Sequence, residues 1–105
     1  MVKQAQFTNK KLLFDKSIDF PDLPGVYKFF NSEHEILYIG KAKNIKNRVK
    51  TYLNVRKGEG KRISKPKSSI KYIETIITKT ETDALILEQG LISKKRPPFN
   101  IQFRD

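Results

Sequence analysis

Two short runs of strand-forming residues, separated by a polar connection, limit the architecture that this chain can adopt. Residues 26–30 and 36–39 are rich in β-branched and aromatic side chains, the types that favour strands. The five residues between them are polar and turn-forming, and connections of this length join antiparallel hairpins. A turn cluster at 21–25, with two prolines and a glycine, precedes the first run. The sequence therefore predicts an antiparallel hairpin near the middle of the chain.

A helix and a further strand are predicted after the hairpin. Asn44 can cap a helix that runs to about residue 53, in which Ile45, Val49 and Tyr52 share one apolar face. Residues 69–79 are predicted to form a long strand. Because neither alternating side of that strand is purely apolar, we expect both of its faces to be partly covered.

The C-terminal part of the chain carries the start and stop signals of a second helix. Thr80 followed by Asp83 resembles a capping box, and the helix is expected to reach about Lys95. The prolines at 97 and 98 would stop it, and residues 99–105 are expected to form a short extended tail. The order strand, strand, helix, strand, helix indicates a small α+β domain.

The length and the charge of the chain narrow both its organisation and its partners. With 105 residues it is expected to form one domain, residues 21–105, after an N-terminal extension at 1–20. The net charge is +11, and residues 41–71 contain 12 basic residues against the single acid Glu59. Such a field suits a phosphate backbone. A solubilising surface loop and an anionic membrane surface are the alternatives, the latter disfavoured because no strongly amphipathic helix accompanies the charge.

Several classes of active site are excluded by composition. The chain has no Cys and one His, His34, so thiol nucleophiles, disulfides and sites built on Cys or paired His are unavailable. No run approaches the roughly 18 apolar residues that a membrane span needs, and the N-terminus shows no secretory signal. We expect a cytoplasmic protein that does not act in a membrane.

Glu88 conflicts with its position in the last predicted helix. On a helical wheel it falls at the centre of an apolar arc formed by Ala84, Leu85, Leu91 and Ile92. A carboxylate that faces a core must be paired or neutralised, because burying it alone costs several kcal/mol. The pattern alone leaves three explanations open: a structural ion pair, which it favours first, a divalent metal, or an exposed side chain. Oxygen ligation of this kind suits Mg²⁺ or Mn²⁺.

Two tripeptides with a fixed spacing carry a resemblance to a known family. Gly25-Val26-Tyr27 is followed, after ten residues, by Tyr38-Ile39-Gly40, which resembles the paired motif of the GIY-YIG nuclease superfamily. The family's further residues follow in order. Residues 24–105 are most similar to the N-terminal nuclease domain of UvrC, the incision subunit of bacterial nucleotide excision repair. The positions that carry the resemblance after the two motifs are Lys41, Arg48, Tyr52, Glu88 and Asn100.

The resemblance implies a fold, an activity and a cofactor. It implies a small central three-stranded antiparallel sheet flanked by helices, and a DNA endonuclease that uses Mg²⁺ or Mn²⁺ to hydrolyse one phosphodiester bond, cutting a single strand. Its partners would be DNA and, if the chain belongs to a longer protein, other excision-repair subunits. One departure is Gly90, where the family usually has a larger residue; glycine weakens a helix by about 1 kcal/mol relative to alanine.

The resemblance also implies a role for each site residue. Glu88 would bind the metal and Arg48 the scissile phosphate. Tyr27 and Tyr38 would line the attack side. The remaining members of the catalytic site would be Lys41, Tyr52 and Asn100.

Which tyrosine activates the water is left open, with Tyr27 the first choice and Tyr38 the second. An unperturbed phenol has a pKa of about 10 and is a poor base at neutral pH. Without the order of the motifs, both tyrosines would be interpreted as strand aromatics that pack on the core.

The basic segment supplies the predicted DNA contacts. Apart from a nuclease, the sequence allows a non-catalytic nucleic-acid-binding module with the same fold and, more distantly, a basic protein associated with RNA or ribosomes. The full set of Tyr27, Tyr38, Arg48 and Glu88 favours the nuclease, since a binding module has no need of a carboxylate facing a polyanion. The predicted DNA-binding residues are Lys43, Lys46, Lys50, Arg56, Lys57, Lys61, Arg62, Lys65 and Lys67.

Overall fold

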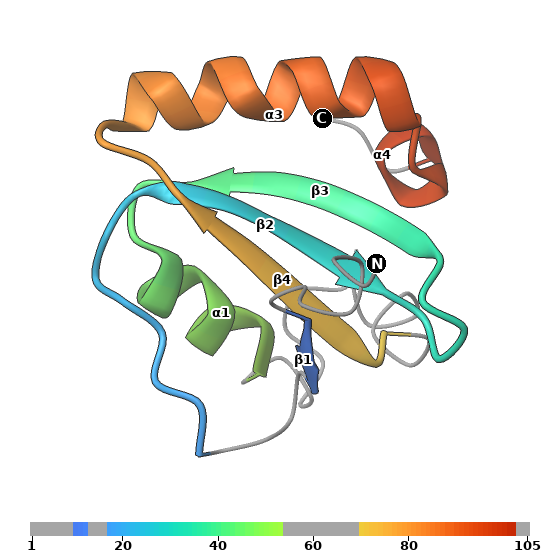
Figure 1. The fold of residues 1–105 in the computed structure, drawn as a ribbon, viewed down its shortest axis with the longest axis horizontal. Coiled ribbons are helices and arrows are strands. Elements are labelled where there is room, and N and C mark those ends of the chain that lie inside the picture. Colours follow the sequence, from blue (N-terminus) through green and yellow to red (C-terminus); the bar gives the residue numbers. More distant parts are fainter. Residues whose placement is uncertain (1–9, 13–16, 54–69, 103–105) are drawn as a thin grey trace, which may run out of the picture.

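A four-stranded antiparallel sheet forms the centre of the molecule (Figure 1). The computed structural model describes residues 10–12, 17–53 and 70–102. The strand order is β1-β4-β2-β3, so β3 lies at one edge. The predicted α+β class with an antiparallel sheet is confirmed, with one strand more than the three expected. The strands are β1 (Lys11–Leu12), β2 (Gly25–Phe30), β3 (Ile36–Ala42) and β4 (Tyr72–Ile77).

The predicted hairpin is the pair β2–β3, which runs in register from Gly25 opposite Ala42 to Phe29 opposite Tyr38. Asn31 organises the connection, because its Oδ1 accepts hydrogen bonds from the backbone N–H groups of Glu33 and Glu35, both at 2.9 Å. His34 adopts a left-handed φ of 65° and its ring stacks on Tyr72 in β4. The local turn bonding thus fixes the register of the two strands that carry the tripeptide motifs.

The other two strands extend the sheet on the far side of β2. β4 pairs antiparallel with β2, and Lys28 faces Glu74 across this pair in an ion pair of 3.2 Å, with both side chains 15% exposed. β1 pairs with β4. It lies within the first 20 residues, which the sequence presents as an extension, and a two-residue strand is too short to show a period.

Helices cover both faces of the sheet (Figure 1). α1 (Ile45–Leu53) begins as predicted at Asn44, whose Oδ1 accepts the backbone N–H of Asn47 at 2.9 Å. Its buried residues pack with Tyr27 and Phe29 of β2. α3 (Glu81–Lys95) lies on the opposite face, where Ala84 joins a second cluster with Val26 and Ile39.

The two ends of α3 follow the sequence signals, but the segment after it does not. Thr80 is the N-cap, and its side chain accepts the backbone N–H of Asp83. Arg96 ends the helix in a left-handed conformation, φ 47°. The expectation of an extended tail is wrong for α4 (Pro98–Gln102), which is a short helix. Pro98 at the first helical position loses no internal hydrogen bond, so the second proline starts a helix here.

Substitution by alanine is expected to have opposite effects on the free energy of unfolding at Gly25 and at Gly90. A Cβ at Gly25 would overlap the backbone carbonyl oxygen of Ile76 in β4, so Gly25→Ala should lower the free energy of unfolding by about 1–3 kcal/mol. Gly90 has nothing within 4 Å of its Cβ position, so Gly90→Ala should raise it by about 0.5–1 kcal/mol through helix propensity. Urea unfolding followed by circular dichroism measures both. Equal stabilities of the two variants would contradict the close β2–β4 contact.

Candidate active site

Three phenol side chains from three elements meet on the α1 side of the hairpin. Tyr27 of β2 and Tyr52 of α1 have their hydroxyl oxygens 3.3 Å apart. Their ring centroids are 5.7 Å apart, and the ring of Tyr38 in β3 lies 6.1 Å from that of Tyr27. The resemblance placed these tyrosines in one site, and the structure brings them together as a phenol cluster, by which we mean Tyr27, Tyr38 and Tyr52.

Gly40 makes room for the phenol cluster. It lies directly opposite Tyr27 in the β2–β3 register, and a Cβ there would overlap the hydroxyl end of Tyr27 and press on the ring of Tyr38. Any larger residue would therefore displace the Tyr27 side chain. Gly40 does not end its strand, because β3 continues through it to Ala42.

The pKa values of the phenol cluster depend on burial and on charged residues of α1 and α3. Burial raises the pKa of Tyr27 well above 10, with further increases from Tyr52 and Tyr38, while Arg48 of α1 opposes the rise. Burial also raises the pKa of Tyr38 to about 12, with contributions from Tyr52 and from the Glu88 carboxylate. Both phenols are therefore protonated at neutral pH, and Arg48 and Glu88 act on the same cluster.

Glu88 lies at the rim of the buried face of α3. The residues of α3 that pack on the sheet beside Ala84 are partly buried, and Glu88 itself is half-buried. Leu85, expected in the apolar arc, is 42% exposed, so that arc is narrower than predicted. The Nε2 of Gln89 donates to Glu88 Oε1 at 3.1 Å. Within the described residues, the structure gives Glu88 no ion pair, which removes support for the purely structural explanation.

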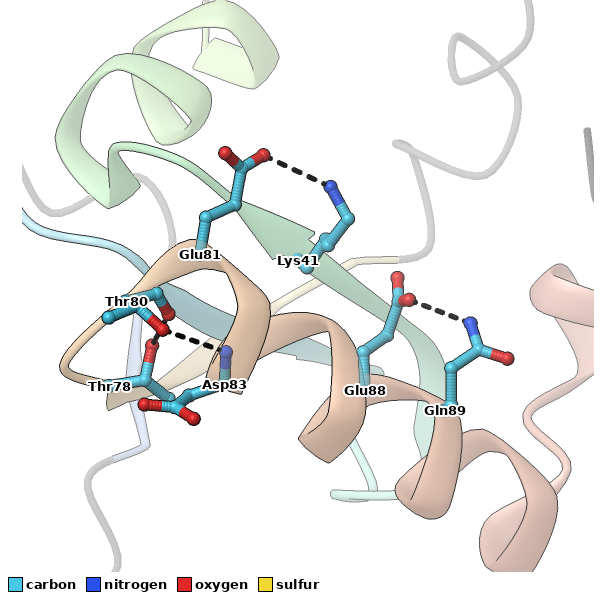
Figure 2. Close-up of polar contacts among 7 residues, drawn as sticks. All are labelled: Lys41, Thr78, Thr80, Glu81, Asp83, Glu88 and Gln89. Carbon is cyan, nitrogen blue, oxygen red and sulfur yellow. Dashed lines mark hydrogen bonds and ion pairs between the residues drawn. The ribbon is translucent and has the colours of Figure 1, made fainter.

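Lys41 lies on the same side of α3 as Glu88 (Figure 2). It occupies the β3 position opposite Val26, on the sheet face that α3 covers. Its Nζ is 3.4 Å from Oε2 of Glu81, in the first turn of α3. No motif in the sequence singles out Glu81, although its place seven residues before Glu88 puts both carboxylates on one helix face.

Asn100 of α4 binds the backbone of β3. Its Oδ1 accepts the backbone N–H of Ile39 at 2.7 Å, and its Nδ2 donates to the carbonyl oxygen of Ile39 at 2.8 Å. This pair of bonds fastens α4 to the residue between Tyr38 and Gly40. These contacts indicate that Asn100 positions β3. A direct part for Asn100 in catalysis stays a prediction.

The predicted DNA-binding residues differ in their surroundings. Lys43 and Lys50 are exposed. Lys46 is half-buried, and its Nζ lies 3.5 Å from Asp19 and 3.9 Å from Asp22, so its charge is partly neutralised. The remaining predicted contacts lie outside the described residues: Arg56, Lys57, Lys61, Arg62, Lys65 and Lys67.

The donors present fit a hard divalent cation held by few protein ligands. Across residues 10–12, 17–53 and 70–102, no group of three or more His, Asp or Glu side chains is placed to hold a metal ion. Glu88 offers a half-buried carboxylate that raises the pKa of Tyr38, with a neutral amide as its neighbour. A cation such as Mg²⁺ keeps several waters and binds through one or two carboxylates, so this donor set is compatible with it. In the same part of the chain, no helix has the length and apolar character to cross a bilayer.

The raised pKa values predict a loss of stability at alkaline pH. The unfolded chain releases the proton of Tyr38 near pH 10, whereas the folded chain holds it to about pH 12. This contribution is therefore fully present below pH 10 and is lost as the pH rises to 12. We expect the urea midpoint to fall over that window, and to fall less steeply in Tyr38→Phe. Full tyrosinate absorbance at 295 nm before the chain unfolds would contradict the burial of the cluster.

Comparisons with known proteins agree with this geometry. A family model described as the UvrC-like GIY-YIG domain matches residues 23–101. The UvrABC system protein C of Acinetobacter baumannii is 52% identical over 83 residues, which cover 79% of this chain. That of Bdellovibrio bacteriovorus is 46% identical over 91 residues, 87% of this chain. The chain spans only 14% of the length of these relatives.

The fold comparison gives the same result. The magnesium-bound GIY-YIG N-terminal endonuclease domain of UvrC from Thermotoga maritima superimposes with a TM-score of 0.72 at 38% identity. The match covers 84% of this chain and 94% of that domain. The resemblance carried by the two tripeptides is confirmed, and the chain belongs to the family of UvrC-like GIY-YIG domains.

Proposed function

We propose that this chain is a metal-dependent endonuclease domain that hydrolyses one phosphodiester bond of DNA in excision repair. The observation that carries the proposal is the phenol cluster that Tyr27, Tyr38 and Tyr52 form from three elements. Arg48 lowers the pKa of Tyr27, and Glu88 raises that of Tyr38. Membership of the UvrC-like family, whose Thermotoga maritima relative is an endonuclease domain bound to a catalytic magnesium ion, supports it.

Glu88 is the residue proposed to hold Mg²⁺ or Mn²⁺. When bound, such a cation supplies Lewis-acid stabilisation of the negative charge that develops on the phosphate or the leaving oxygen. The Glu88 carboxylate is half-buried and has a neutral neighbour in Gln89, so among the described residues no protein cation competes for it in an ion pair. Partial desolvation also strengthens its attraction for a cation.

Arg48 is proposed to bind the scissile phosphate. Its guanidinium is always charged and presents a planar fork that can donate to two phosphate oxygens. It is exposed on α1, one turn before Tyr52, so it can meet a ligand from solvent while remaining close to the phenol cluster. Charge that is already in place before the reaction is usually the largest single source of rate enhancement.

The exposures of the two motif tyrosines bear on which of them meets the attacking water. Tyr27 is 2% exposed, whereas Tyr38 is half-buried. We therefore give Tyr38 the direct role and place Tyr27 behind it, hydrogen-bonded to Tyr52, which reverses the preference drawn from the sequence. Because the Tyr38 phenol is protonated at neutral pH, its Oη can accept a hydrogen bond from water and orient it without first losing its own proton.

Lys41 and Asn100 support this arrangement in different ways. Lys41 brings an ammonium group to the side of α3 that carries Glu88 (Figure 2), where it can attract an incoming phosphate. Asn100 fixes the backbone of Ile39, between two residues that form or border the phenol cluster. Lys41 therefore acts through its charge, and Asn100 acts by fixing the position of the Ile39 backbone.

The wider setting is part of the same proposal. DNA is the proposed substrate, other excision-repair subunits are proposed partners if the chain is part of a longer protein, and the cytoplasm is the proposed location because bacterial DNA lies there. A non-catalytic nucleic-acid-binding module is the alternative. Arg48 and Glu88 each change the pKa of a phenol in the same cluster, and binding alone does not require both residues.

Removing the carboxylate or the guanidinium should abolish cutting and spare binding. Glu88→Gln and Arg48→Ala should each slow the nicking of supercoiled plasmid in Mg²⁺ or Mn²⁺ by about 100-fold or more. Salt-dependent DNA binding, measured by fluorescence anisotropy, should persist in both variants: Glu88→Gln should leave the salt slope unchanged, and Arg48→Ala should flatten it by no more than the loss of one phosphate contact, about one unit. Excess EDTA should stop nicking by the unaltered chain. Equal nicking by the unaltered chain and Glu88→Gln would reveal a contaminating nuclease and would contradict the proposal that this chain is an endonuclease.

Two lysines of α1 provide a matched test of the DNA surface. Lys50 is exposed, whereas Lys46 shares its charge with Asp19 and Asp22. Lys50→Gln should weaken binding for all DNA sequences and flatten the slope of log affinity against log salt by about one unit. Lys46→Gln should change the slope by less. A larger change from Lys46→Gln would show that its acidic partners release it when DNA binds.

A further inference from the structure

Lys41 lies between two carboxylates of α3, Glu81 and Glu88, and binds Glu81. Figure 2 shows its side chain between those of Glu81 and Glu88, with the ammonium group turned toward Glu81. Lys41 Nζ lies 3.4 Å from Glu81 Oε2. The neighbour that the structure gives Glu88 is the neutral amide of Gln89, at 3.1 Å.

The spacing of Glu81 and Glu88 along α3 allows Lys41 to bind either carboxylate. Glu81 and Glu88 are separated by two helical turns on one face, which corresponds to about 10 Å along the axis. A flexible four-carbon stem rooted between them on β3 can carry its charge toward either carboxylate. An ammonium group on Glu88 would neutralise the carboxylate proposed to hold the cation, and cation and ammonium would then compete for the same oxygens.

We propose that Glu81 is a positioning residue that holds Lys41 away from Glu88 and so keeps that carboxylate available to a divalent cation. The inference rests on the proposed function, in which Glu88 is the metal ligand. Glu81 suits the role because it is fixed in the first turn of α3, just after the Thr80 cap, where the helix dipole favours a negative charge. The same contact keeps the Lys41 ammonium on the side of α3 where a phosphate would arrive.

Direct measurement of Mn²⁺ binding without DNA tests the inference apart from activity. The free Mn²⁺ signal in electron paramagnetic resonance gives the Kd of the full chain. In Glu81→Gln we expect Lys41 to turn to Glu88 and the Kd to rise about fivefold, the effect of one competing partly exposed ion pair. An unchanged Kd would overturn the proposal.

Asp83→Asn is the matched control for lost charge. Asp83 lies in the same first turn of α3, and the structure pairs it with no cation among the described residues. Its removal takes away one negative charge from the same turn of α3 without releasing Lys41, so the Kd should rise by less than twofold. If Asp83→Asn and Glu81→Gln raise the Kd equally, the effect is general electrostatics and the inference is wrong.

Removing the ammonium group completes the test. In a Lys41→Met background, Glu81→Gln should raise the Kd no more than Asp83→Asn does, because no lysine remains to compete for Glu88. A full fivefold rise in that background would overturn the proposal. Glu88→Gln separates this inference from the proposed function: if it binds Mn²⁺ as the unaltered chain does, the metal site lies elsewhere, whatever the other variants show.

Discussion

The pairing of Tyr27 with Gly40 across the β2–β3 hairpin is the contact on which the site depends. Only a residue without a side chain leaves room for the Tyr27 phenol at that position. The same register places Tyr38 opposite Phe29, on the face where α1 adds Tyr52. A slip of one residue would turn every β3 side chain to the opposite face and take Tyr38 out of the phenol cluster.

The position of β3 at the sheet edge explains how residues from both faces act on one cluster. In the interior of a sheet the two faces are separated by neighbouring strands, but among the described residues β3 has a strand on one side only. Glu88 from the α3 face raises the pKa of Tyr38 on this edge strand, while Arg48 lowers that of Tyr27 from the α1 face. Asn100 occupies the open side, where its amide bonds Ile39 as a neighbouring strand would and satisfies edge groups that would otherwise be free to pair with another chain.

The sequence predicted the parts of the fold that local chemistry decides. The hairpin, the Asn44 and Thr80 caps and the order of the motif residues all follow from short-range patterns. β1 and α4 were missed because neither is long enough to show a period, and because two successive prolines were interpreted only as a stop signal. The burial of Tyr27 and the pairing of Lys41 with Glu81 depend on tertiary contacts, which a single sequence does not display.

The basic residues in the described part of the chain include some that are paired with a carboxylate and others that are in no ion pair. Lys28, Lys41 and Lys46 each lie next to a carboxylate from another segment, and these pairs connect strand to strand, strand to helix and helix to the N-terminal segment. Their charges contribute little to the long-range field, since each is offset locally. Among the described residues, the structure gives Lys43, Arg48 and Lys50 no ion pair. Lys43, Arg48 and Lys50 therefore add uncompensated positive charge around α1, beside the phenol cluster, to the long-range field that the net charge of +11 produces.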